Sequence, residues 1–255
     1  MEMDILGLEI GRGGYGSVYE IKKDPSLCAK VSDKKMSSCR KWSNEFHKIN
    51  SFMEKISAEP KYKSLKMVRI IKPVEFKETD GKCMMIMPRI YRPDDVRRFM
   101  LTHRKETYKP SHTIQAQLGI PSGKMVFKSR GEFIGLKEIK SYVPEADLKI
   151  ASYELGMTMA LIHTVGKNDA YDIEVYLGRE HLSKKTRFYI ADFDLSEEIK
   201  DNNEDTMERM SWSLEAMPYF PTMESDPALF QLFKKGYAKT ANNPALTERI
   251  FKNYT

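Results

Sequence analysis

Glycines crowd one short stretch near the N-terminus, and the residues on both sides of it are typical of strands. The stretch 11–18 reads G-R-G-G-Y-G-S-V and fits the pattern G-x-G-x-x-G-x-V. Because apolar runs at 5–10 and 17–21 flank it, it predicts strand, glycine turn and strand, and not a turn that opens a helix. Missing side chains at such a turn let backbone amides approach phosphates, and the valine can cover a base. Unless the stretch is a plain glycine-rich hairpin, the residues with these roles are Gly11, Gly13, Gly14, Gly16 and Val18.

The next strand-like run ends in a lysine. Residues 27–30 read L-C-A-K, close to the pattern V-A-I-K, which predicts that the Lys30 ammonium lies near the α- and β-phosphates of a bound nucleotide. Apolar residues then recur at helical spacing over 39–56. This lysine needs an acidic partner, and Glu45 on the helix is the expected one, with Glu54 as the alternative. A lone surface lysine on a strand is the competing interpretation.

The remaining pattern divides the chain into two lobes. Strand-like runs at 67–76 and 83–87 complete a predicted five-stranded antiparallel sheet with one helix. We therefore expect an α+β fold with a nucleotide-binding lobe at 1–87, a hinge at Met87 and a mainly helical lobe at 88–255. The segments predicted in the second lobe are helices at 144–165, 227–238 and 244–254, a hairpin of strands at 173–177 and 187–191, and an irregular basic stretch at 91–133 with a possible short helix over 94–100.

The composition is typical of a globular protein and excludes several other classes of protein. Hydrophobic residues make up 41% and charged residues 31%, and no segment reaches the roughly 18 consecutive apolar residues of a transmembrane helix. The first residues lack the pattern of a secretory signal, so we expect an intracellular chain, cytoplasmic or nuclear. The net charge of +6 permits an anionic ligand, and because it is spread along the chain we expect no nucleic-acid partner. Cys28, Cys39 and Cys83 are odd in number and widely spaced, so we expect reduced thiols and no zinc site.

Acidic residues in the second lobe supply the groups that magnesium requires. Asp192 follows an apolar run, opens a D-F-D variant of the motif D-F-G, and is the predicted Mg²⁺ ligand. Asp194 stands where that motif has glycine, and it either stiffens the turn or takes a positive φ. Upstream, a segment with the spacing of H-R-D-L-x-x-x-N makes Asp169 the expected catalytic residue and Glu174 the second metal ligand, with Asp172 as another candidate base. A solvated acidic hairpin is the competing interpretation.

These motifs, in this order, resemble the protein-kinase-like superfamily and, within it, a domain family common in fungi that is sometimes labelled a zinc-finger protein domain. The second resemblance covers roughly residues 130–240. It lies in M-A-L-I-H at 159–163, D-A-Y-D-I-E-V-Y-L-G at 169–178, A-D-F-D at 191–194, P-Y-F-P at 218–221 and L-F-K-K-G-Y at 232–237. A glutamate at 174 is usual in that fungal family. That family implies a fold and a candidate nucleotide site without a substrate, and no Cys or His spacing in this chain suits zinc.

The superfamily implies phosphoryl transfer from ATP with Mg²⁺ in a cleft between two lobes. Lys30, Glu45 and Asp169 are then the catalytic residues, and the acceptor, protein or small molecule, is unknown. The missing His-Arg before Asp169 and the missing glycine after D-F support an alternative. That alternative is a pseudokinase that binds nucleotide weakly or not at all and acts as a protein-interaction module. Nucleotidyl transfer to a protein on the same fold is a third hypothesis.

Overall fold

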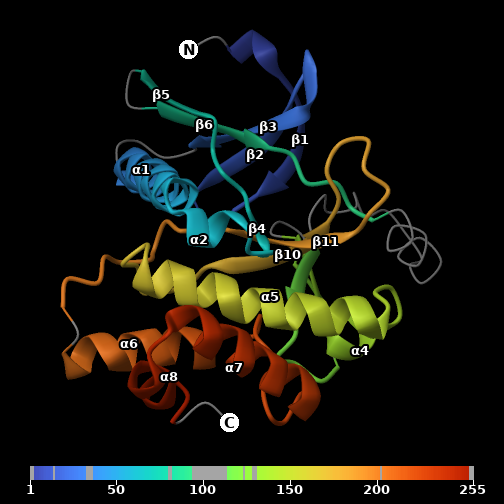
Figure 1. The fold of residues 1–255 in the computed structure, drawn as a ribbon. Helices are drawn as coiled ribbons and strands as arrows, with labels where there is room; N and C mark the ends of the chain where they lie inside the picture. The colour runs from blue at the N-terminus through green and yellow to red at the C-terminus, as the bar shows by residue number, and fades with distance from the viewer. Residues whose placement is uncertain are drawn as a thin grey trace.

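The first part of the chain is an antiparallel sheet with one long helix packed against it, as Figure 1 shows. The computed structural model describes residues 3–13, 15–32, 37–79, 82–93, 114–122, 124–127, 131–201 and 203–252. A short 3₁₀ helix, η1 (Met3–Ile5), precedes the sheet, whose strand order is β1-β2-β3-β6-β5. The strands are β1 (Leu6–Arg12), β2 (Gly16–Ile21), β3 (Asp24–Ser32), β5 (Glu75–Thr79) and β6 (Lys82–Pro88). The helices are α1 (Ser37–Ala58) and the short α2 (Pro60–Lys63).

The apolar pattern explains how this helix and sheet meet. Trp42, Ile49 and Ile56 recur along one face of α1 and are buried. In the sheet, Ala29 and Met84 belong to a buried cluster between neighbouring strands. The predicted α+β class, with a small antiparallel sheet and one helix followed by a helical part, is confirmed.

The second part carries a sheet of its own in addition to its helices. The order of this six-stranded sheet is β4-β11-β10-β7-β9-β8, with β4 parallel to β11 and β7 parallel to β9. Its strands are β4 (Arg69–Ile70), β7 (Ile114–Gln117), β8 (Lys124–Phe127), β9 (Gly131–Gly135), β10 (Glu174–Gly178) and β11 (Arg187–Ala191). The irregular stretch expected at 91–133 was therefore wrong where β7, β8 and β9 form, and the possible helix at 94–100 lies outside the described residues. Because β4 precedes residue 87 and pairs with β11, the two parts are interleaved near the hinge, and the boundary at 87 stays a prediction.

The helices of the second part form its core beneath the sheet, as Figure 1 shows. They are α4 (Leu136–Lys140), α5 (Glu145–Thr164), α6 (Glu204–Glu215), α7 (Pro227–Ala241) and α8 (Pro244–Ile250). Helix α5 lies where the periodicity predicted it, and it contacts α7 through glycines. A Cβ on Gly156 would lie 1.9 Å from the carbonyl oxygen of Phe233, and one on Gly236 would lie 2.1 Å from that of Tyr153. The two helix backbones can approach this closely only because both positions lack a side chain. None of the described helices is long and apolar enough to cross a membrane.

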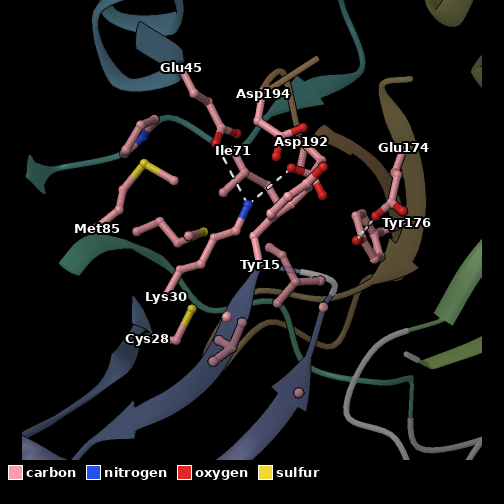
Figure 2. Close-up of a pocket in the computed structure, with 18 of the residues that line it drawn as sticks. Tyr15, Cys28, Lys30, Glu45, Ile71, Met85, Glu174, Tyr176, Asp192 and Asp194 are labelled. Carbon is pink, nitrogen blue, oxygen red and sulfur yellow. Dashed lines mark hydrogen bonds and ion pairs between the residues drawn. The ribbon is translucent and has the colours of Figure 1, made fainter. Parts of the chain in front are cut away.

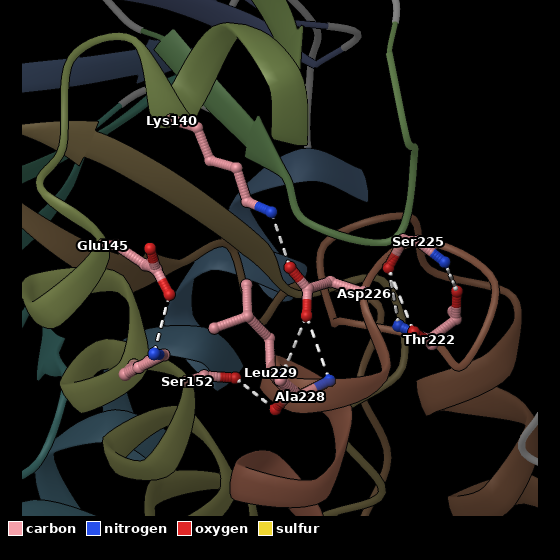
Figure 3. A network of polar contacts seen from close by, with 9 residues as sticks. Lys140, Glu145, Ser152, Thr222, Ser225, Asp226, Ala228 and Leu229 are labelled. Carbon is pink, nitrogen blue, oxygen red and sulfur yellow. Dashed lines mark hydrogen bonds and ion pairs between the residues drawn. The ribbon is translucent and has the colours of Figure 1, made fainter.

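A network of polar contacts fixes the start of α7, as Figure 3 shows. Asp226 is the N-cap of α7, and its Oδ1 accepts hydrogen bonds from the amides of Ala228 and Leu229 at 3.0 and 3.1 Å. Its other carboxylate oxygen lies 2.6 Å from Lys140 Nζ on α4. The Ser152 hydroxyl on α5 donates to the Leu229 carbonyl at 2.8 Å. These contacts hold α4, α5 and α7 together at one end of the helical core.

Two of the three cysteines are joined. Cys39 in the first turn of α1 and Cys83 on β6 form a disulfide, with Cα atoms 5.4 Å apart. Cys28 on β3 is the free cysteine and is buried. The prediction of three reduced thiols was wrong for this pair. Packing of α1 on the sheet brings together cysteines that are 44 residues apart, which their spacing in the sequence cannot reveal.

Candidate nucleotide site

A pocket of about 610 Å³ opens between the first sheet, α1 and the second sheet (Figure 2). Most of the predicted site residues line it. They are Gly11, Gly13, Gly16, Val18, Lys30, Glu45, Met87, Glu174 and Asp192. Gly14 lies outside the described residues, and Asp169 does not line the pocket. The pocket therefore brings together residues from both predicted lobes.

Lys30 is held by two carboxylates from different parts of the chain. Its Nζ lies 3.0 Å from Asp192 Oδ1 and 3.7 Å from Glu45 Oε2. The other oxygen of Glu45 accepts a hydrogen bond from the amide of Phe193 at 3.1 Å, so this glutamate links the lysine to the turn that follows β11. Burial alone would lower the pKa of Lys30, but the charges of Asp192 and Glu45 outweigh it and raise that pKa above its ordinary value. The ammonium is therefore charged at neutral pH and available to a second anion.

Glu45 itself is buried. Burial, opposed by the charge of Lys30, raises the pKa of Glu45 to about 7. A buried carboxylate that keeps its charge needs its cation, so Lys30 and Glu45 stabilise each other as a pair.

The glycine strand forms one wall, and its glycines have different roles. The Gly13 amide donates to the Gly16 carbonyl at 2.8 Å and closes the turn. A Cβ on Gly16 would lie 2.2 Å from the Val31 carbonyl oxygen and 2.7 Å from Trp42 Cη2, so packing of the sheet against α1 requires this glycine. A Cβ on Gly11 would meet the Val18 side chain at an ordinary 3.7 Å. Packing does not require glycine at Gly11, which leaves the approach of a ligand as a reason for it.

Glu174 lies on the opposite wall in a polar network that the sequence did not reveal. The hydroxyl of Tyr176 donates to Glu174, and the side chain of Gln115 on β7 also hydrogen-bonds to that carboxylate. The hydroxyl of Tyr219 donates to Gln115 Oε1 at 2.8 Å. Burial and the charge of Asp192 raise the pKa of Glu174 to about 8. Gln115 belongs to the segment expected to be irregular, so no sequence signal pointed to it, whereas Tyr219 belongs to the P-Y-F-P stretch quoted above.

In the loop before β10, two aspartates that are three positions apart in the sequence have different surroundings. Asp169 is 3% exposed, and its Oδ1 accepts hydrogen bonds from the amides of Tyr171 and Glu197 at 3.1 and 2.8 Å. The backbone then turns through left-handed conformations at Ala170 and Asp172, with φ of 58° and 61°. Asp172 lines the pocket, and burial together with the charge of Asp192 raises its pKa. The candidate base that faces the pocket is thus Asp172.

The D-F-D turn is built around its first aspartate. The left-handed φ, 63°, belongs to Asp192 and not to Asp194, the position that departs from the motif. Phe193 is buried in the core of the second part. Asp194 lines the pocket beside Asp192, and burial and the charge of that neighbour raise its pKa. The carboxylates of Asp192 and Asp194 therefore both line the pocket, while the ring of Phe193, between them in the sequence, is buried.

The chemistry of these groups suits a hard cation bound together with phosphates. Carboxylate oxygens from Asp192 and Glu174 are the donor type that Mg²⁺ prefers, and a bound cation would offset the burial and the repulsion from Asp192 that raise the pKa of Glu174. Among the described residues, no three acidic, histidine or cysteine side chains are grouped closely enough to hold a metal ion by themselves. Mg²⁺ commonly takes one or two carboxylates and completes its shell with water and nucleotide phosphates, so the residues fit that mode of binding.

No protein-family model and no curated protein sequence matches the chain. Among solved structures, two crystal structures of the kinase domain of PknI from Mycobacterium tuberculosis, each a double mutant, are similar over 97% of this chain. One has 13% sequence identity and a TM-score of 0.43 with 94% of that chain covered, and the other has 14% and 0.44 with 92% covered.

Proposed function

We propose that this chain is a protein-kinase-like phosphotransferase that binds MgATP in the pocket between its two parts. The observation that carries the proposal is the placement of Lys30 between Asp192 and Glu45, with Glu45 also bound to the Phe193 amide. A lysine held in this way beside a glycine turn offers a charged, fixed group to nucleotide phosphates. The order of the motifs in the sequence supports the same function.

Each wall of the pocket has a role in this proposal. Gly11, Gly13 and Gly16 line the wall against which the phosphates bind, Lys30 pairs with the phosphates, and the base lies against Val18 and Met87. Asp192 and Glu174 hold Mg²⁺, which when bound offsets the charge of the phosphates. The nucleotide-binding lobe is 1–87 and the second lobe is 88–255.

The residue proposed to accept the proton of the attacking hydroxyl is Asp172. It lines the pocket, whereas the carboxylate of Asp169 is buried and bound to two backbone amides. A general base has to reach the proton that it abstracts, so we propose Asp172 for that role and a positioning role in the loop for Asp169. The acceptor is a protein or a small molecule bearing a hydroxyl.

A second candidate function is a pseudokinase, a nucleotide-binding or partner-binding module without transfer. The burial of Asp169 and the replacement of the D-F-G glycine by Asp194 favour it. Nucleotidyl transfer on the same fold is separated from phosphoryl transfer by labelling with ATP that carries ³²P at the α- or the γ-position. Label from the γ-position alone supports phosphoryl transfer, and label from the α-position supports nucleotidyl transfer.

Thermal unfolding with ATP, with and without Mg²⁺, tests the nucleotide site. At ten times Kd, a ligand stabilises the folded chain by about 1.4 kcal/mol, or roughly 3 °C for a chain of this size. We expect this metal-dependent rise in the wild type and its loss in Lys30→Ala and Asp192→Ala. Lys77→Ala is the matched control, because Lys77 is an exposed lysine on β5 that is ion-paired to Glu75 at 3.0 Å, away from the pocket. If the wild type shows no rise at millimolar MgATP, the proposal fails.

A further inference from the structure

A disulfide fastens the helix that supplies Glu45 to the strand that leads into the hinge. Cys39 is 1% exposed in the first turn of α1, and Cys83 is fully buried on β6. Beyond Cys83, β6 continues through Met85 to Met87, and both methionines line the pocket. The bond therefore joins two elements that form different walls of the same site.

The side chains that follow Cys39 on α1 reach the lysine. Trp42, one turn along, is fully buried, and Lys30 Nζ lies 5.0 Å from the centroid of its ring. Glu45, about one turn further, pairs with Lys30 and accepts the amide of Phe193. A shift of the first turns of α1 would therefore move every group of this helix that holds Lys30.

We propose that Cys39 and Cys83 form a redox-sensitive clamp on the nucleotide pocket. The disulfide keeps α1 where Glu45 meets Lys30, and its reduction to two thiols lowers the affinity of the pocket for MgATP. This inference rests on the proposed function, because it describes regulation of the same site.

The chemistry is thiol–disulfide exchange with a small disulfide such as oxidised glutathione. One cysteine thiolate attacks a sulfur of oxidised glutathione and forms a mixed disulfide, releasing one glutathione thiolate. The other cysteine thiolate then attacks the mixed disulfide at the protein sulfur and releases the second glutathione. The protein loses two electrons and two protons, oxidised glutathione gains them, and reduction follows the reverse path.

The effect of the disulfide on MgATP binding and the effect of MgATP on the disulfide equilibrium can both be measured. If the disulfide raises the affinity for MgATP by some factor, then MgATP must shift the disulfide equilibrium toward the oxidised form by the same factor. Coupling between two sites in a protein is commonly 5- to 150-fold, and we expect roughly tenfold here.

The first measurement is the Kd for MgATP of the intact wild-type chain, oxidised and reduced, by titration calorimetry. The redox state is verified by alkylating the denatured protein, because one cysteine reacts when the pair is bonded and all three react when it is reduced. We expect the oxidised chain to bind about tenfold more tightly. Cys39→Ser and Cys83→Ser should bind as weakly as the reduced wild type and should not respond to reductant, which controls for effects of the reductant itself.

The second measurement needs no variant and so does not depend on the serine chains folding. The wild type is equilibrated in glutathione buffers with and without saturating MgATP, and the midpoint ratio of the squared concentration of reduced glutathione to the concentration of oxidised glutathione is read by alkylation. We expect MgATP to move that ratio about tenfold toward the disulfide. Equal affinities in both redox states and an unmoved midpoint would overturn the clamp while MgATP binding stands. If the oxidised wild type binds no MgATP at all, the proposed function fails and the clamp fails with it.

Discussion

At the scale of single residues, we expect substitution of Asp172 to lower catalysis and substitution of Asp169 to lower stability. Asp172 faces the pocket, so Asp172→Asn should lower phosphoryl transfer at least about 100-fold, the usual worth of a general base, with little change in the affinity for MgATP. Asp169 caps two amides from the interior of the loop, so Asp169→Ala should cost roughly 2–3 kcal/mol of stability. Release of γ-³²P and chemical unfolding measure the two effects. If Asp169→Asn loses transfer with unchanged stability while Asp172→Asn keeps it, the roles are reversed.

Motif spacing predicted the charged centre of the site but not how the loops aim their side chains. Lys30, Glu45 and Asp192 follow from the order of the motifs, because each lies on a regular element or directly after one. Asp169 and Asp172 are three positions apart in a loop with left-handed backbone at Asp172, and that conformation decides which carboxylate reaches the pocket. Sequence reasoning does not resolve φ at such positions. The left-handed residue of the D-F-D turn was missed for the same reason.

At the scale of elements, the close crossing of α5 and α7 should reverse the effect that a Gly→Ala substitution usually has on the stability of a helix. At an exposed helical site, Gly→Ala stabilises by up to about 1 kcal/mol. At Gly156 the added Cβ would lie 1.9 Å from the backbone of Phe233, so the helices must separate and Gly156→Ala should destabilise by about 1–3 kcal/mol. Lys235→Ala, on the exposed face of α7, is the control and should change stability little. A stabilised Gly156→Ala in chemical unfolding would show that the two backbones do not meet there.

Elements with a strong period were predictable and short paired strands were not. Helices α5 and α7 carry apolar residues at helical spacing, and the hairpin of β10 and β11 has compact apolar runs, so each was expected near its observed position. Strands β7, β8 and β9 have four or five residues each and depend on pairing with one another and with β10. Their stability comes from distant partners, and no local pattern records it.

At the scale of the whole molecule, the ion pair between Lys30 and Asp192 joins the two sheets. Lys30 belongs to β3 of the first sheet and Asp192 follows β11 of the second, 162 residues along the chain. The first sheet and the hairpin of β10 and β11 were predictable separately, but the parallel pairing of β4 with β11 was not, since it joins segments far apart in sequence. The placement of the pocket walls thus depends on contacts that only the folded chain reveals.

Acid stability of the whole chain should depend on His163 in the core between α5 and α7. Its Nδ1 lies 2.8 Å from the Tyr237 hydroxyl, and burial lowers the pKa of His163 from 6.5 to about 3. As the pH falls, His163 therefore binds a proton near pH 6.5 in the unfolded chain but only near pH 3 in the folded chain. The free energy of unfolding consequently falls with pH across this window, by about 2 kcal/mol at pH 5. His163→Gln keeps a hydrogen-bonding group without titrating and should remove this loss.

The test has to be a difference between variants, because buried carboxyls act in the opposite direction. Glu45 and Glu174, with pKa values raised to about 7 and about 8, hold protons in the folded chain that the unfolded chain releases above pH 4.5. Their effect makes the folded chain more stable as pH falls toward 4.5 and masks His163 in the wild-type curve. Subtracting the unfolding free energies of His163→Gln from those of the wild type, from pH 7 to pH 4, isolates the histidine. A His163→Gln curve parallel to that of the wild type would contradict the prediction, because it would mean that His163 binds its proton as readily in the folded chain as in the unfolded chain.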